Sequence, residues 1–233
     1  MADFSTLYDI VPKTFFVTDG EGNLVYGTRP GDELVTSECK ITLCDREYTV
    51  NYGFLPENKE YSERFPLIFE TLVSLTRNGL TKSYRKFSYL YTFLCSIMKS
   101  EVSSSIICET ADRDDVLGTA FVSEKGLLTA FAIITHYFSK NASVPSFSYK
   151  NNMESLEISL FSEGAKREIP VFLCDYCREI AKNGGFSLEF GYKDGRAFMT
   201  SHIESVSSKG ISFTAPTPED YTFISLLCAL LVV

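Results

Sequence analysis

The chain has 233 residues, of which 45% are hydrophobic and 14% are aromatic, so it can bury a sizeable core and is not expected to be disordered. It carries 30 acidic and 22 basic residues, and the net charge of −8 argues against a concentrated basic face for nucleic acid. We therefore expect no nucleic-acid partner. The strongest basic run, KSYRK at residues 82–86, is short and is interpreted as the solvated face of a helix.

Neither end of the chain has the pattern of a membrane segment. The opening MADFSTLYDIVPK lacks a charged region followed by a long apolar core, so we expect a cytoplasmic location. The last thirteen residues, YTFISLLCALLVV, are apolar but shorter than the ~20 residues that span a bilayer. We expect no membrane span, and instead a buried terminal helix or a surface covered by a second subunit.

The residues that most often bind metals are scattered. The seven cysteines are odd in number, which predicts reduced thiols and no disulfide framework. Cys174 and Cys177 have CxxC spacing, but no second pair or histidine stands nearby, so we expect both to face the core. His136 and His202 are interpreted as structural groups, and the acidic cluster at 112–115 as a solvated turn. No metal site is expected.

The N-terminal part predicts a small antiparallel sheet over residues 13–55. Thr14 to Val17 and Leu24 to Tyr26 are β-rich runs on either side of a turn at residues 19–22. A second pair of extended runs, at 39–43 and 48–52, flanks residues 44–47.

Two amphipathic helices are predicted next. Apolar residues recur at helical spacing from Phe65 to Leu75, Asn78 and Gly79 stop the run, and Tyr84 to Met98 resume it. We expect a helical hairpin with wide apolar faces, packed on a second subunit or on the flanking sheets.

The remaining chain alternates between strand and helix periods. The predicted strands are 105–109, 117–122, 156–160, 186–190 and 197–203, with helices at 127–138 and 173–181. Gly184 is expected to end the second helix in a left-handed conformation. Another strand, a Pro216/Pro218 break and the apolar tail follow from 210 to 233. The order of elements predicts an α+β fold with a two-layer α/β sandwich.

Residues 104–205 resemble the ATP-binding domain of sensor histidine kinases and their GHKL relatives. The resemblance is carried by PVFLCDYCREIAKNGGFSLEFGYKDGRAFMTSHI, similar to the family's last helix, Gly-Gly break and final hairpin, and by EKGLLTAFAIITHYFSKNAS, similar to its asparagine-box helix. It implies a dimerisation-like hairpin upstream and, in FFVTDGEGNLVYG, the first hairpin of a PAS-like segment. The expected domains are 1–57 (PAS-like), 58–101 (hairpin) and 102–233 (ATPase-like sandwich).

The chain departs from the family at each nucleotide-binding box. Ile133 and Tyr137 stand where asparagines coordinate magnesium, and Ser162 stands where an aspartate accepts the adenine amino group. Gly164 matches the first glycine of that box and Lys166 the second, while residues 167–171 contain no glycine for the lid. The hairpin from 57 to 100 contains no phosphoacceptor histidine.

Two functions remain open. We favour a histidine-kinase-like protein without catalytic residues or cofactor, which forms a homodimer and binds or regulates a signalling protein partner. The alternative is a nucleotide sensor or kinase with a divergent pocket for ATP and magnesium. For that pocket the candidate residues are Asn141, Ser162, Glu163 and Gly164. A weaker third hypothesis is that the N-terminal sheet binds a small ligand.

Overall fold

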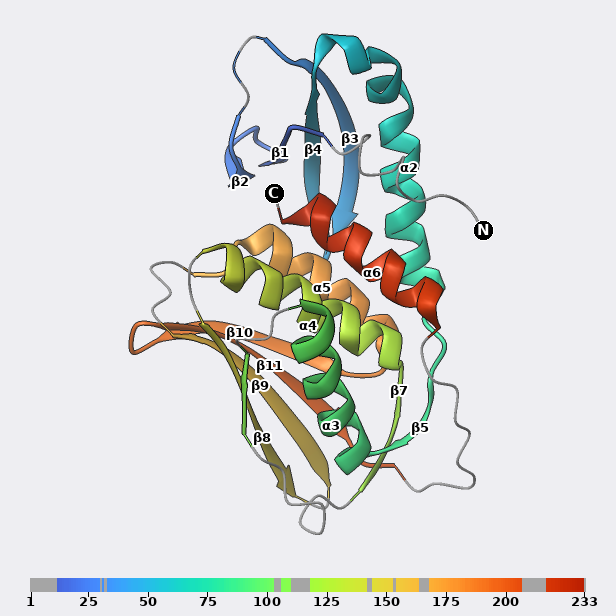
Figure 1. The fold of residues 1–233 in the computed structure, drawn as a ribbon, viewed down its shortest axis with the longest axis vertical. Coiled ribbons are helices and arrows are strands. Elements are labelled where there is room, and N and C mark those ends of the chain that lie inside the picture. Colours follow the sequence, from blue (N-terminus) through green and yellow to red (C-terminus); the bar gives the residue numbers. More distant parts are fainter. Residues whose placement is uncertain are drawn as a thin grey trace.

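The structure is a computed structural model that describes residues 12–29, 31, 33–102, 106–109, 118–141, 144–152, 154–163, 168–206 and 217–232. It contains two principal sheets with a layer of helices between them (Figure 1). The α+β prediction is confirmed, and the predicted sandwich corresponds to the second sheet and the helices that cover it.

The N-terminal sheet is antiparallel throughout, as predicted. Its strands are β1 (Thr14–Asp19), β2 (Leu24–Gly27), β3 (Val35–Leu43) and β4 (Arg46–Phe54), in the order β2-β1-β4-β3. The Asp19 carboxylate accepts backbone N–H bonds from Glu21 and Asn23, which closes the first turn. Cys44 and Asp45 form the two-residue turn between β3 and β4, both with positive φ.

The two predicted helices are present, but the connection between them differs from a helical hairpin. After the short η1 (Pro56–Asn58), α2 (Lys59–Asn78) packs against β3, β4 and a later helix, α5 (Val171–Gly184). The chain then forms a strand, β5 (Ser83–Lys86), before α3 (Phe87–Ile97) and the π-helical η2 (Met98–Val102). Figure 1 shows α2 beside the first sheet and α3 beside the second.

The basic run at 82–86 does not form a solvated helix face. Residues 83–86 lie in β5, which pairs with β7 (Thr119–Val122). Arg85 is almost fully buried and forms an ion pair with Glu124 in the first turn of α4 (Glu124–Lys140). Because a buried guanidinium requires a partner, this pair fixes β5 against the start of α4.

The second sheet has the order β10-β11-β9-β8-β6, and its strands are β6 (Ile107–Cys108), β8 (Val144–Asn152), β9 (Ser155–Glu163), β10 (Ser187–Lys193) and β11 (Arg196–Glu204). The predicted strand at 117–122 is β7, which pairs with β5 and not with this sheet. Strand β8 was not predicted from the sequence. The strand expected beyond 210 falls outside the described residues.

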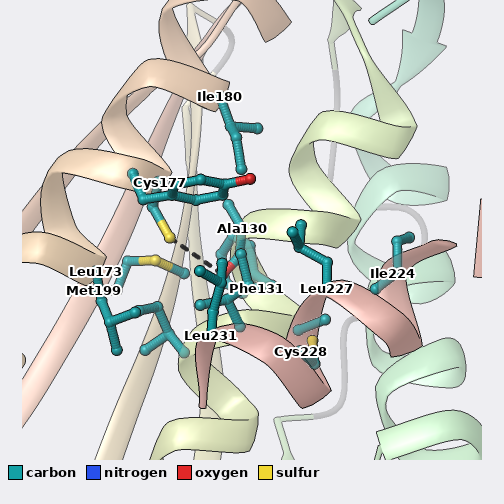
Figure 2. Close-up of a cluster of buried hydrophobic side chains, with 14 of the residues drawn as sticks. Ala130, Phe131, Leu173, Cys177, Ile180, Met199, Ile224, Leu227, Cys228 and Leu231 are labelled. Carbon is teal, nitrogen blue, oxygen red and sulfur yellow. Dashed lines mark hydrogen bonds between the residues drawn. The ribbon is translucent and has the colours of Figure 1, made fainter. Parts of the chain in front are cut away.

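The helix layer packs on one face of the second sheet. Figure 2 shows its centre, where side chains of α4, α5, the sheet and α6 (Pro218–Leu231) meet; the labelled residues include Ala130, Phe131, Leu173, Cys177, Met199, Leu227 and Leu231. Cys174 and Cys177 are both buried, as expected, and the Cys177 thiol donates to the Ala130 carbonyl at 3.8 Å. Among the described residues, no helix has the length and apolarity needed to cross a membrane.

Helix α5 joins the two sheets. Its Phe172 ring lies 5.4 Å from Tyr48 and 6.1 Å from Tyr26 of the N-terminal sheet, while Leu173 and Cys177 face the other way. Asp175, only 2% exposed, accepts a 2.7 Å hydrogen bond from the Tyr48 hydroxyl and forms ion pairs with Arg46 and Arg178. The buried hydrophobic side chains therefore form one continuous core.

The Gly-Gly break after α5 has a packing cause. Gly184 is still helical, and the left-handed residue is Gly185 (φ 81°), one position later than predicted. A Cβ atom on Gly185 would lie 2.7 Å from the Phe121 carbonyl oxygen of β7. Glycine is therefore required at position 185 for two reasons: the left-handed conformation, and the close approach of the backbone to that of β7.

We predict that Gly185→Ala destabilises the protein by more than Gly195→Ala. Gly195 also has positive φ (75°), but a Cβ there meets nothing within 4 Å, so it reports backbone strain alone, about 1 kcal/mol. Gly185→Ala adds a clash, with an expected total of about 2–4 kcal/mol. Urea unfolding of both variants measures the difference, and equal losses would contradict the packing explanation.

Candidate binding site

The described surface is hollowed where the N-terminal sheet meets α5. Three neighbouring hollows of about 430, 400 and 420 Å³ share wall residues where α5 begins. The shared residues are Glu168, Val171, Val25 and Arg46. We call this region the seam.

The first hollow combines aromatic and charged groups. Tyr26 of β2 and Tyr137 of α4 line it, together with Lys140, Asn141 and Glu168. Burial raises the pKa of Tyr26, and the neighbouring Tyr137 adds to that rise, so the Tyr26 hydroxyl stays protonated at neutral pH. The Tyr137 hydroxyl donates to the Glu168 carbonyl at 3.5 Å. The hollow therefore combines two tyrosine rings with the Lys140 ammonium and the Glu168 carboxylate.

The second hollow is lined by arginine and aromatic side chains, whereas the third combines Arg46 and Tyr48 with three acidic residues, Asp19, Glu21 and Glu47. Arg46 and Arg178 reach Asp175 from opposite sides, and their side chains remain 61% and 40% exposed. The Arg178 guanidinium lies 5.0 Å from the centre of the Phe190 ring. Val171 and Tyr192 at the edge are exposed. Each arginine can hold Asp175 and still present N–H donors to a ligand, because a guanidinium has five.

The residues predicted for a nucleotide pocket are only partly brought together. Asn141 caps the C-terminus of α4, lines the first hollow and donates to the Tyr137 carbonyl at 2.8 Å. Ser162 is fully buried on β9, and its hydroxyl has no hydrogen-bond partner among the described residues. Gly164, Lys166 and the Glu163 side chain lie outside the described residues, as does the acidic cluster at 112–115.

The two histidines lie apart from the seam. His136 is half-buried on another side of α4, and His202 lies on the outer face of the second sheet, 3.3 Å from Glu157 and 3.5 Å from Glu189. The described ranges contain no group of three or more His, Cys, Asp or Glu side chains suited to a metal ion.

The sequence did not identify the seam. Tyr26, Arg46 and Arg178 carry no motif, and they meet because β2, β4 and α5 pack together over long sequence separations. The β-rich runs of the N-terminal strands indicated only a small antiparallel sheet.

A magnesium nucleotide does not fit the residues present at the family's positions. Ile133 is fully buried and apolar, and the Tyr137 phenol is a poor substitute for an amide oxygen as a magnesium ligand. Ser162 offers a neutral hydroxyl inside the core, where adenine recognition would require an accessible carboxylate. Asn141 alone could offer an amide oxygen to a cation.

Comparison with known proteins gives the following similarities. No protein-family model and no curated protein matches the chain. Among solved structures, histidine kinase AdeS of Acinetobacter baumannii is 10% identical, over 65% of this chain and 82% of that one, with a TM-score of 0.43. Histidine kinase ThkA, in complex with response regulator protein TrrA, is 9% identical over 88% of this chain and 99% of that one, with a TM-score of 0.44.

The histidine kinase domain of the Escherichia coli osmosensor EnvZ is 7% identical, over 58% of this chain and 96% of that one, with a TM-score of 0.40. Histidine kinases are thus among the proteins this chain is similar to, as the sequence resemblance predicts.

We predict that Ser162→Ala leaves stability unchanged or raises it by up to about 1 kcal/mol, because a buried hydroxyl without a partner costs free energy. Ser201 is the matched control. It is also fully buried, on the neighbouring β11, but its hydroxyl donates to the Ile158 carbonyl at 3.3 Å. Ser201→Ala should therefore cost about 1 kcal/mol in urea unfolding. A clear loss for Ser162→Ala would show that its hydroxyl has a partner.

Proposed function

We propose that the chain is a histidine-kinase-like protein that binds a signalling protein partner and does not transfer phosphate. The observation that carries the proposal is the full burial of Ile133 and Ser162. Both stand at positions where the resembled family contacts nucleotide and magnesium. Inside the core, neither side chain can do so without opening the fold.

The seam supports a role in protein binding. Arginine and aromatic side chains are enriched in the centres of protein interfaces, because they combine a large contact area with directed hydrogen bonds. Here Arg46, Arg178 and Tyr192 stand beside the exposed Val171. A partner segment with acidic and apolar side chains would match both parts of this surface.

The alternative is a nucleotide sensor with a divergent pocket. It is favoured by the first hollow, where Tyr26 and Tyr137 offer rings for stacking and Lys140 offers a cation for phosphate. Asn141, one of the candidate residues for a divergent pocket, lines this hollow. The nearby Glu168 carboxylate would oppose an anion unless a cation joined it.

Calorimetric titration with ATP and ADP in the presence of magnesium separates the two functions. We expect no saturable heat for the wild-type protein and no rise in melting temperature.

If binding does occur, comparing the variants Asn141→Ala and Asn183→Ala shows whether the nucleotide lies in the first hollow. Both amides donate to the carbonyl four residues earlier near a helix end, but only Asn141 lines the first hollow. Saturable binding that Asn141→Ala weakens and Asn183→Ala leaves unchanged would overturn the proposal in favour of the sensor.

We also propose that the protein is a homodimer that uses the outer face of α2. Leu67 and Leu75 lie on this face, 69% and 48% exposed, and apolar side chains at this exposure favour contact with a second surface. The other face of α2 packs on the N-terminal sheet, so this face is the one left for a partner.

Light scattering after size exclusion should therefore give twice the chain mass of 26.2 kDa. The double variant Leu67→Glu/Leu75→Glu should give the monomer mass, because it places two charges in the contact. Leu24→Glu is the control, since Leu24 is a leucine of similar exposure (45%) that lies in the seam instead. A monomeric wild type, or dissociation by Leu24→Glu alone, would contradict this interface.

A further inference from the structure

A separate cavity of about 170 Å³ lies between α4, α6 and the start of η2, on a different side of α4 from the seam. It arises from two regular stripes. Leu128, Ala132 and His136 recur every four residues on α4, and Ile224 and Cys228 stand four apart on α6. Such spacing aligns side chains on one helix face.

Most of the side chains that line the cavity are apolar, and five of them are almost fully buried. Met98, Leu128 and Ala132 are at most 1% exposed, and Ile224 and Cys228 are 6% and 7% exposed. Figure 2 shows Ile224 and Cys228 on α6, next to the packed centre of the helix layer. Voids of this size are few in close-packed interiors and each one lowers stability, so an empty cavity here would be unfavourable.

His136 gives the apolar cavity one polar position. The imidazole is half-buried, and both burial and the nearby Lys140 lower its pKa, so it is neutral at pH 7. A neutral imidazole can donate through one ring nitrogen and accept through the other. Around it lie α4 with Lys140, α6 with Tyr221 and Ser225, and η2 with Met98.

We propose that this cavity binds a small, neutral, mainly apolar molecule about the size of one aromatic ring, with a single hydrogen-bonding group directed at His136. The size follows from the volume, since an apolar protein cavity of ~150 Å³ accommodates benzene. The neutral charge follows from the walls, because the described residues that line them include no acidic or basic side chain apart from the imidazole. The ligand enters beside Ser225, which lies at the rim and is exposed.

The test compares phenol with benzene, which have the same ring and differ by one hydroxyl. Calorimetric titration of the full chain with phenol should be saturable and should raise the melting temperature. Benzene should bind at least five-fold more weakly. His136→Leu should remove most of that difference, because it removes the hydrogen-bonding group and keeps an apolar wall.

Two variants locate the site. Ala132→Leu fills the cavity from its floor, and Ser225→Leu blocks it at the rim, where an exposed position tolerates substitution without loss of the fold. Both should weaken phenol binding at least ten-fold. The matched control is Ala229→Leu, which adds a leucine to α6 outside the cavity and should leave the affinity unchanged.

Absence of saturable phenol binding to the wild type would overturn the proposal. Equal affinity of wild type and a folded Ser225→Leu variant would do the same, because binding would then occur elsewhere. If Ala132→Leu fails to fold, Ser225→Leu and Ala229→Leu still decide the outcome. Equal binding of phenol and benzene would overturn the part assigned to His136.

Discussion

The burial of Asp175 is the constraint on which the arrangement of the chain depends. A carboxylate that is 2% exposed must be paired and hydrogen-bonded, and its three partners come from two different parts of the fold. Tyr48 and Arg46 belong to the N-terminal sheet, while Arg178 lies one turn along α5. The same helix presents Glu179 to the backbone N–H of Cys44 in the β3–β4 turn at 2.8 Å. The polar side chains of α5 therefore fix the position of this helix on the N-terminal sheet, and its apolar side chains pack toward the second sheet.

The other helices follow from this placement. With α5 fixed, α4 packs beside it over the second sheet, and the buried pair of Arg85 and Glu124 holds β5 and β7 against the start of α4. Helix α6 then covers α4, and Lys125 joins the two through a 2.7 Å ion pair with Asp220. Segments that the sequence suggested as separate domains thus share one core. The seam and the apolar cavity are the places where this packing of helices is incomplete.

Periodicity predicted the elements with regular burial, because it reports which face of a helix or strand is apolar. Helices α4 and α5 and the final hairpin were expected on that basis, whereas the N-terminal sheet was predicted from β-rich runs around turn residues. Prediction from the sequence failed where tertiary contacts reverse the usual preference of a residue for burial or exposure. Arg85 was expected to be solvated because arginine usually is, but the carboxylate of Glu124, 39 residues later, pairs with it in the interior. Strand β8 was missed because Pro145 and Phe147 are its only buried residues and its other positions are at least partly exposed, so no alternating apolar pattern marks it. The seam could not be predicted either, since its walls come from β2, β4, β10, α4 and α5 without any local motif.

The position of α5 between the sheets also bears on how a bound partner could influence this protein. A hinge requires two bodies with separate cores and a flexible connection between them, and the described core is continuous from Phe15 to Leu231. A molecule in the seam would touch both sheets and the start of α5 at once. Such a molecule would therefore act on the contact between α5 and the N-terminal sheet, at the Tyr48–Asp175 hydrogen bond, within one continuous core.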